Sequence, residues 1–293
     1  ERISKKLILS SQSFFVENRR GRAVLKRIVI SGNTAMESFV LGISADSLAQ
    51  FPFSLPSKFG FSIQANKLLN FENIPLDCDF YFAPAIESFV GGDTVCSLIA
   101  CGFLEKNENK FLADIGTNCE LCVYSAELDK IFCASTSAGP AFEGYGIDCG
   151  IPAQEGAIAK IKVLEKNEIK CFVLGNGKAI GICGTGILSA VSEFLRNGII
   201  DSFGTFISGK EKIALKNEIY ICQKDIRNFQ LAKSAVLTGL EILSEKSKCK
   251  SGILYLAGGF GSLLDIKDAC DVKMIPKFLS EKTFAAGNAS LCG

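Results

Sequence analysis

Apolar and polar residues alternate along this chain in two rhythms, one typical of strands and one typical of helices, with glycines where the rhythm changes. Residues 1–22 mix apolar and charged positions at roughly helical spacing, and a short β-rich run, Arg27–Ser31, comes next. Gly32 then opens a turn, and Asn33 or Thr34 can cap a helix whose apolar positions follow at helical spacing. Strand, turn and helix in this order predict an α/β fold.

A hairpin forms the centre of the predicted structure. An apolar run that begins at Phe111 ends in Asp114-Ile-Gly-Thr-Asn118, and a second run, Glu120–Tyr124, returns from it. Two such runs with glycine between them predict antiparallel strands, and Lys130–Ser135 predicts a third strand beside them. Strand-like alternation returns further along the chain, at 157–164 and 169–174.

Glycines also precede the predicted helices. Gly91-Gly92-Asp93-Thr94 can cap a helix that runs to about Phe103, and Gly184-Thr185-Gly186 leads into an amphipathic helix that reaches Leu195. Residues 223–247 keep helical periodicity, and a buried strand at Ile253–Ala257 and the string Gly258-Gly259-Phe260-Gly261 follow. The hairpin, the second helix entry and this last string are three junctions where backbone can approach a ligand closely.

The organisation of the chain predicts two parts. Residues from about 42 to 84 are irregular and hold four of the seven prolines, yet they are rich enough in aromatic residues to predict a packed insertion. A boundary fits between the helix that ends near Phe103 and the strand that begins at Phe111. We therefore expect a first part at 1–106, with the insertion, and a second part at 107–293.

Composition excludes several classes of protein. A chain with 48% hydrophobic and 22% charged residues is typical of a globular protein. A net charge of +1 lacks the excess of positive charge that is typical of proteins that bind nucleic acid. No apolar run is long enough to span a bilayer, so we expect a soluble protein with no membrane partner. Thirteen scattered cysteines, with no signal peptide, predict reduced thiols in the cytoplasm. Histidine is absent, which excludes histidine-dependent catalysis and histidine–zinc sites.

The hairpin turn is a candidate phosphate loop. Backbone amides around Gly116, together with the Thr117 hydroxyl, can donate to phosphate oxygens, and Asp114 can orient a hydrated Mg²⁺. The same residues also suit an ordinary hairpin turn. The helix entry at 184–186 can likewise receive an anion, or can be a tight turn that packs a helix on a sheet.

Eight strings in order resemble one family, the ATP-dependent reductive activators of corrinoid proteins, within the superfamily of acetate and sugar kinases, heat-shock ATPases and actin. The strings are Ser31-Gly-Asn-Thr-Ala-Met36, Phe89-Val-Gly-Gly-Asp-Thr94, Leu112-Ala-Asp-Ile-Gly-Thr-Asn118, Ser135-Thr-Ser-Ala-Gly-Pro-Ala-Phe-Glu-Gly144, Gly181-Ile-Cys-Gly-Thr-Gly186, Gln223-Lys-Asp-Ile226, Leu256-Ala-Gly-Gly-Phe-Gly261 and Gly287-Asn-Ala-Ser-Leu291. The resemblance implies an RNase H-like two-lobe α/β fold that clamps Mg·ATP, with the first lobe incomplete here.

The resemblance also implies roles for single residues. Phosphate and metal would lie at Asp114, Gly116, Thr117 and Asn118, with Asp114 as metal ligand. Gly258, Gly259 and Phe260 would lie under the adenosine, and Gly184, Thr185 and Gly186 would line the same cleft. Glu143 would orient water or metal, or else it is a buried capping carboxylate.

The implied activity is ATP-driven reduction of cobalt from Co(II) to Co(I) in a corrinoid protein. Electrons would come from a donor through a [2Fe-2S] or other Fe–S cluster in a domain outside this chain, and a homodimer is possible. Cys119 stands where the family usually has glycine, and no first-lobe Asp-x-Gly-Thr hairpin precedes Arg27. We therefore expect a fragment with weak ATPase activity of its own. A radical-dehydratase activator, a small-molecule kinase and a non-catalytic nucleotide- or partner-binding scaffold remain alternatives.

Overall fold

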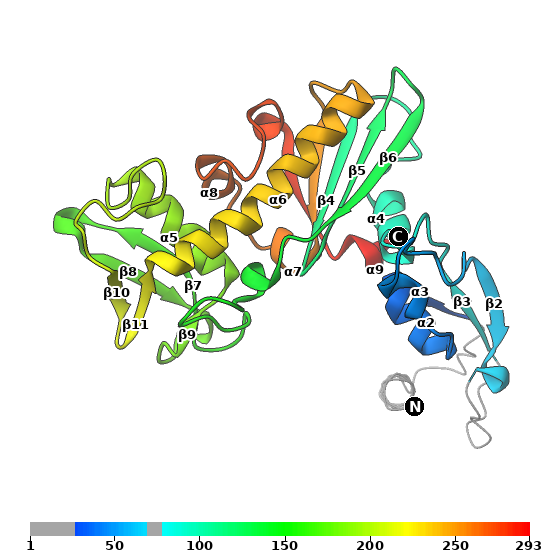
Figure 1. The fold of residues 1–293 in the computed structure, drawn as a ribbon, viewed down its shortest axis with the longest axis horizontal. Helices are drawn as coiled ribbons and strands as arrows, with labels where there is room; N and C mark the ends of the chain where they lie inside the picture. The colour runs from blue at the N-terminus through cyan, green and yellow to red at the C-terminus, as the bar shows by residue number, and fades with distance from the viewer. Residues whose placement is uncertain (1–26, 69–77) are drawn as a thin grey trace, which may run out of the picture. The chain divides into compact units, whose positions relative to one another are not determined.

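A computed structural model describes residues 27–68 and 78–293 of the chain, shown as a ribbon in Figure 1. The helical spacing predicted over residues 1–22 lies outside the described residues. The chain divides into two compact units, one made of residues 1–100 with 290–293 and the other of residues 101–289. The boundary predicted between residues 106 and 107 stays a prediction about domain organisation.

The first unit is built on a small mixed sheet. Its strands are β1 (Arg27–Ile30), β2 (Phe61–Gln64) and β3 (Asp79–Phe82), in the order β1-β3-β2. β1 runs parallel to β3, and β2 runs antiparallel to it. Its helices are α2 (Thr34–Leu41), α3 (Asp46–Ala49), the 3₁₀ turn η1 (Ala65–Lys67), α4 (Gly92–Ala100) and the end of α9 (Ala289–Cys292).

Local sequence explains where α2 begins and ends. The Asn33 side chain accepts a hydrogen bond from the amide of Met36, as an N-cap does, and Gly42 ends the helix with φ of +70°. The strand at Arg27, the helix after Asn33 and the helix entered at Gly92 are confirmed. The prediction of irregular backbone at 42–84 is wrong for β2 and β3. Each of these strands has four residues, which is too short for alternation to show.

A five-stranded sheet in the order β13-β12-β4-β5-β6 organises the second unit. The strands are β4 (Lys110–Ile115), β5 (Cys119–Ser125), β6 (Lys130–Thr136), β12 (Ile253–Ala257) and β13 (Thr283–Gly287). β4, β5 and β6 are antiparallel neighbours, as the sequence predicts, while β12 runs parallel to both β4 and β13. The carboxyl ends of β4 and β12 therefore lie side by side.

Two smaller sheets complete the second unit. One has the order β8-β7-β9, with β7 (Ala157–Val163), β8 (Ile169–Val173) and β9 (Gly181–Ile182). The other is the hairpin of β10 (Lys212–Lys216) and β11 (Ile219–Cys222). α5 (Gly184–Arg196) packs on β7, and the predicted helix entry at Gly184 is confirmed. The short elements are η2 (Pro140–Glu143), η3 (Glu165–Asn167), η4 (Leu174–Asn176), α7 (Gly258–Gly261), α8 (Ile266–Asp271) and η5 (Lys277–Lys282).

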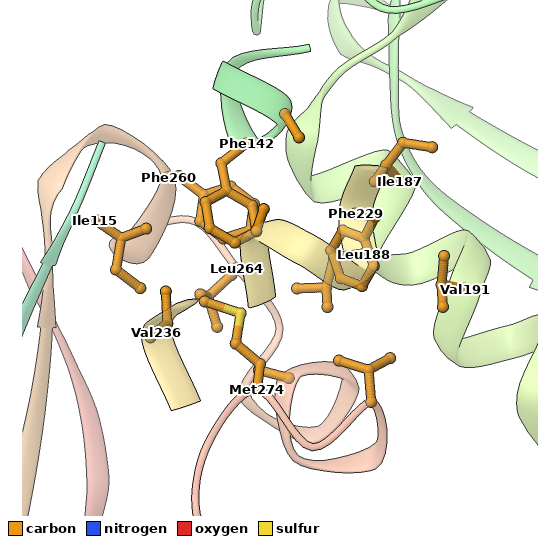
Figure 2. Packing of buried hydrophobic residues seen from close by; sticks show 14 of the residues in the cluster. Ile115, Phe142, Ile187, Leu188, Val191, Phe229, Val236, Phe260, Leu264 and Met274 are labelled. Atoms are coloured by element: carbon orange, nitrogen blue, oxygen red, sulfur yellow. The ribbon is translucent and has the colours of Figure 1, made fainter. Parts of the chain in front are cut away.

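One long helix, α6 (Gln223–Ser247), joins the sheets of the second unit. It crosses from the β10–β11 hairpin to β5 and β6, and Figure 1 shows it running the length of this unit. Ile226, Phe229, Val236 and Leu240 follow helical spacing and are buried in one continuous core. Figure 2 shows part of this core, where residues from α5, α6, α7 and η2 meet. The core therefore supports every element that carries a glycine junction.

No helix in residues 27–68 and 78–293 has the length and apolar content needed to cross a membrane. All thirteen cysteines lie in the described part of the chain, and no disulfide joins any of them.

Candidate functional site

The phosphate-loop candidate lies where β4 meets β12. Asp114 is the partner of Ala257 on one side and of Glu120 on the other, so its position is set by three strands. Gly258 follows directly, with φ of +83°, and a Cβ on it would lie 2.6 Å from the Asp114 carboxylate and 2.6 Å from the Ile115 carbonyl. Only glycine allows this approach. Two of the three predicted junctions therefore touch.

The third junction reaches the same place through η2. A Cβ on Gly184 would lie 1.9 Å from the Phe142 carbonyl oxygen, so the start of α5 rests directly on the backbone of η2. The ring of Phe142 in turn stacks on the ring of Phe260, with centroids 4.4 Å apart (Figure 2). These contacts join the helix entry, the loop after β6 and the end of β12.

One cavity of about 410 Å³ lies between these elements. Among its lining residues are six that the sequence singled out: Gly116, Glu143, Gly184, Thr185, Gly259 and Phe260. Phe142, Tyr145, Pro152, Ala153, Cys183 and Leu263 complete the lining. A volume of a few hundred cubic ångströms is typical of small-molecule sites. The predicted convergence of the three glycine junctions on one pocket is therefore observed.

Glu143 lies beside the hairpin turn. The Thr117 hydroxyl donates a hydrogen bond to Glu143 Oε2 over 2.8 Å, and both residues are exposed. The alternative that Glu143 is a buried capping carboxylate is therefore wrong. A carboxylate at the cavity that holds the hydroxyl of the loop can bind a cation or orient a water molecule.

Some predicted residues lie next to the cavity without lining it. Asp114 is partly buried behind Gly258, and Asn118 accepts the Gly116 amide hydrogen through its carbonyl oxygen over 2.9 Å. That bond closes the hairpin, so the Gly116 amide is engaged within the turn. A Cβ on Gly186 would lie 2.1 Å from the Ile158 carbonyl oxygen, which places this glycine at the contact of α5 with β7.

The sequence reasoning missed the other half of the cavity wall. Tyr145, Pro152 and Ala153 follow η2 in an exposed loop, and nothing in their spacing distinguishes them from ordinary loop residues. Phe142 was part of a recognised string, but an apolar residue in a small-residue loop indicates core packing as readily as a site.

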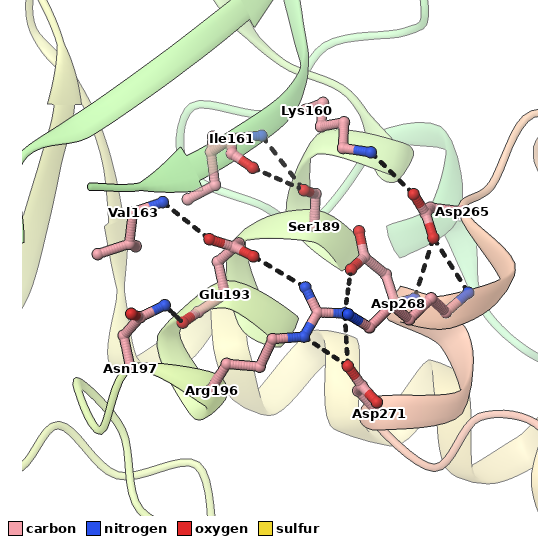
Figure 3. A network of polar contacts seen from close by, with 11 residues as sticks. Lys160, Ile161, Val163, Ser189, Glu193, Arg196, Asn197, Asp265, Asp268 and Asp271 are labelled. Carbon is pink, nitrogen blue, oxygen red and sulfur yellow. Dashed lines mark hydrogen bonds and ion pairs between the residues drawn. The ribbon is translucent and has the colours of Figure 1, made fainter. Parts of the chain in front are cut away.

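An ion-pair network fixes the position of α5 (Figure 3). Arg196 contacts Asp268 over 2.7 Å, Glu193 over 2.8 Å and also Asp271. Glu193 Oε2 accepts the Val163 amide hydrogen of β7, so the network connects α5 to both α8 and the sheet beneath it. Burial, with a contribution from Asp265, raises the pKa of Asp268, and the Arg196 charge opposes that rise. The helix that begins at the cavity is thus held at its far end.

A second polar cluster lies at the start of α6. Asp225 accepts the amide hydrogens of Asp148 and Cys222 with its two carboxylate oxygens, at 2.8 and 2.9 Å. The side chains of Asp148, Cys222 and Asp225 are close enough together to hold an ion. Because both Asp225 oxygens already serve backbone amides, this cluster is a helix cap, and Asp148 lies in a turn as predicted.

Two family models match the chain. The C-terminal domain of RACo, described as the ASKHA domain, matches residues 108–293, and the RACo middle region matches residues 4–106.

Individual relatives agree with the family models. The corrinoid activation enzyme RamQ of Eubacterium limosum is 31% identical over 90% of this chain and 48% of its own length. The [Co(II) methylated amine-specific corrinoid protein] reductase of Methanosarcina barkeri is 31% identical over 73% of this chain and 43% of its own. A solved structure titled reductive activator for corrinoid, iron-sulfur protein superposes with a TM-score of 0.78 at 28% identity, over 91% of this chain and 45% of that one.

The chain thus spans about half the length of the relatives it matches. Both family models together extend over nearly the whole sequence, and the second unit has the architecture of the ASKHA domain. The chain belongs to the RACo family of corrinoid reductive activators and carries its middle region and its C-terminal ASKHA domain.

Proposed function

We propose that this chain is the nucleotide-binding part of a reductive activator that couples ATP to the reduction of cobalt from Co(II) to Co(I) in a corrinoid protein. The observation that carries the proposal is that glycines from all three junctions line one and the same cavity. The relatives named for corrinoid activation and for Co(II) corrinoid protein reduction support the choice of partner.

The residues around the cavity suit Mg·ATP. A Cβ on Gly259 would meet no heavy atom within 4 Å, so the cavity has room beside the backbone at the end of β12. The adenosine would lie against Gly259 and Phe260, and the phosphates would lie towards Gly116 and Thr117. Asp114 and Glu143 supply the carboxylates that Mg²⁺ prefers. Bound Mg·ATP supplies the free energy of phosphoanhydride hydrolysis.

Phosphate binding would compete with a contact in the chain itself. The Thr117 hydroxyl donates to Glu143, and a phosphate oxygen is a strong alternative acceptor for the same proton. If Thr117 donated to the phosphate instead, the Glu143 carboxylate would be free to orient a water molecule. We therefore expect the contact between Thr117 and Glu143 to differ when nucleotide is bound.

Coupling to cobalt reduction requires contacts that differ between two states. Nucleotide can favour the reduced corrinoid only if the protein binds its partner differently with and without ATP in the cavity. Reduction of cobalt needs one electron, and a donor acting through an Fe–S cluster in a separate domain would supply it. We also expect a cytoplasmic protein and a possible homodimer.

The direct test is calorimetric titration of the protein with Mg·ATP. Asp114→Asn should weaken binding about tenfold or more, because a contact to a charged group contributes ~1.5–3 kcal/mol. Asp129→Asn is a matched control. Asp129 is an exposed aspartate at the turn between β5 and β6, and its φ of +47° suits asparagine. It lies at the end of β5 away from Glu120, the strand partner of Asp114, and its contacts are with Lys106 and Tyr124. If Asp114→Asn and the unmodified protein bind Mg·ATP with equal affinity, the assignment of this cavity as the Mg·ATP site is wrong.

The corrinoid partner is tested separately. A corrinoid protein in the Co(II) state, mixed with the full activator and a reductant, should show the optical spectrum of Co(I) only when ATP is present. A protein that binds Mg·ATP but leaves the cobalt spectrum unchanged would favour the kinase or scaffold alternatives.

A further inference from the structure

Two cysteines face each other across β5 and β6. Cys122 and Cys133 are direct partners in the antiparallel register of these strands. Their sulfur atoms lie 3.1 Å apart, with the Cys122 thiol donating to the Cys133 sulfur. Side chains of directly opposite residues lie on the same face of a sheet. The two thiols are therefore held together by the strand pairing itself.

The backbone geometry permits a covalent link between them. Directly opposite residues in antiparallel strands have Cα atoms about 4.5–5.5 Å apart. Disulfides connect Cα atoms that are about 4.4–6.8 Å apart, so the sheet already has the spacing that a bridge needs. Bond formation requires the sulfur atoms to approach by about 1 Å from their present distance, since a disulfide bond is about 2.0 Å long.

The two thiols differ in a way that suits thiol–disulfide exchange. Cys133 is partly exposed, and the hydrogen bond from Cys122 lowers its pKa, which favours the thiolate that attacks disulfides. Cys122 is buried, and the hydrogen bond it gives to Cys133, together with burial, raises its pKa well above the usual range. One thiol is thus suited to react first and the other to react second.

We propose that Cys122 and Cys133 form a redox-sensitive dithiol that a small-molecule disulfide oxidises to a cross-strand disulfide. The Cys133 thiolate attacks one sulfur of the oxidant, and its first thiolate leaves. Cys122 loses its proton and attacks the Cys133 sulfur of this mixed disulfide, which expels the second thiolate. The protein gives up two electrons and two protons, and the oxidant is reduced to two thiols.

The pair lies close to the candidate phosphate loop. Cys122 is two residues beyond Glu120, which is the strand partner of Asp114 and accepts a hydrogen bond from the Ser135 hydroxyl over 3.1 Å. A disulfide would therefore connect β5 to β6 two residues along β5 from Glu120, the strand partner of Asp114. The inference depends on the register of the sheet and not on the proposed function, so either can fail without the other.

Oxidised glutathione is the probe, and a tryptic digest gives the readout. Trypsin separates the two cysteines at Lys130, which leaves Cys122 in peptide 111–130 and Cys133 in peptide 131–160. After oxidation of the native protein and alkylation of the remaining thiols, we expect these peptides to be joined and the link to map to Cys122 and Cys133. Reduction should separate them again.

Variants distinguish this pair from its neighbours. The same two peptides also contain Cys119 and Cys149, so Cys149→Ser should keep the link and Cys133→Ser should abolish it. Circular dichroism checks that both variants fold, and fragmentation of the joined wild-type peptides locates the bond independently. Three results would each overturn the proposal: both thiols still alkylated after oxidation, glutathione retained on Cys133 alone, or a bond between other cysteines.

Discussion

The rings of Phe142 and Phe260 stack with centroids 4.4 Å apart and planes 14° from parallel. Phe142 comes from η2, before the small sheets of the second unit, and Phe260 comes from α7, after the long helix. Both rings are almost fully buried. Because Gly184 rests on the Phe142 backbone, this stack fixes the relative positions of three walls of the cavity.

Replacement of Phe142 should therefore affect both stability and ligand binding. Phe142→Leu removes the stacked ring, and we expect a loss of about 1–2 kcal/mol in the free energy of unfolding together with weaker Mg·ATP binding. Phe229→Leu is the matched control, because the Phe229 ring contacts Phe142 edge-on at 6.1 Å and does not line the cavity. It should lower stability by a similar amount and keep the affinity. Equal loss of affinity in both variants would mean that the stack has no special role.

Neighbouring glycines at the end of β12 allow a second comparison. Gly258→Ala places a methyl group against Asp114 and the backbone of Ile115, at a positive φ, so we expect a clearly less stable protein. Gly259→Ala meets no atom, so its stability should be unchanged, whereas its methyl group points into space that we assign to the nucleotide. Thermal unfolding should therefore show a lower melting temperature for Gly258→Ala only. Calorimetry should show weaker Mg·ATP binding by Gly259→Ala in spite of its unchanged stability. If Gly259→Ala binds Mg·ATP normally, the nucleotide does not contact this residue.

The ion-pair network of Arg196 predicts that replacing this residue lowers stability to an extent that depends on pH. Arg196→Met leaves the buried Asp268 carboxylate without its cation, and breaking such a pair costs about 3–5 kcal/mol. The pKa of Asp268, already raised by burial, should rise further, because the opposing charge is gone. A raised pKa in the folded protein means that stability falls as the carboxyl ionises, so the defect should grow from acid to neutral pH.

Urea unfolding at two pH values measures this effect. The second change Asp268→Asn, made in the Arg196→Met background, should recover part of the stability at neutral pH. A defect of Arg196→Met that is independent of pH would show that lost packing of the arginine side chain, and not the unpaired carboxylate, causes it.

Local patterns in the sequence were sufficient for the elements that carry the cavity. The β4–β5 hairpin, the start of α5 at Gly184 and the full extent of α6 follow from periodicity and glycine position, which act over a few residues. Contacts between residues far apart in the sequence could not be predicted from such local patterns. Thr117 and Glu143 are 26 residues apart, and each was a candidate without any sign that they form a hydrogen bond.

Other features of the structure correspond to no recognisable pattern in the sequence. The pairing of Arg196 with Asp268 joins positions 72 residues apart, and a charged helix residue ordinarily indicates a solvated face. β2 and β3 were missed because four residues give too few alternations to identify a strand. Burial of a polar side chain such as Glu37 is equally invisible in the sequence, since it depends on the packing of α2 and α4 around it.

Glu37 connects the stability of the first unit to pH. Its carboxylate is buried and accepts the Gly32 amide hydrogen over 3.0 Å, while Oε2 has no hydrogen-bond partner among the described residues. Burial raises the pKa of Glu37 from 4.5 to about 8, although the bond from Gly32 acts in the opposite direction, and Asp93 adds to the rise. Asp93 is itself affected by burial, which raises its pKa.

The sign of the effect follows from proton binding. Between pH 4.5 and about 8 the folded protein keeps the Glu37 proton that the unfolded chain loses, so stability falls as pH rises through this window. Glu37→Gln keeps the acceptor for Gly32 and removes the ionisation. We expect the variant to be more stable than the parent at pH 8, by on the order of 2–4 kcal/mol, and similar to it at pH 5. Glu87→Gln, at an exposed position of the same unit, is the matched control for the substitution itself. Urea unfolding followed by circular dichroism at both pH values measures these differences in stability. A parent protein with equal stability at pH 5 and pH 8 would contradict the raised pKa of Glu37.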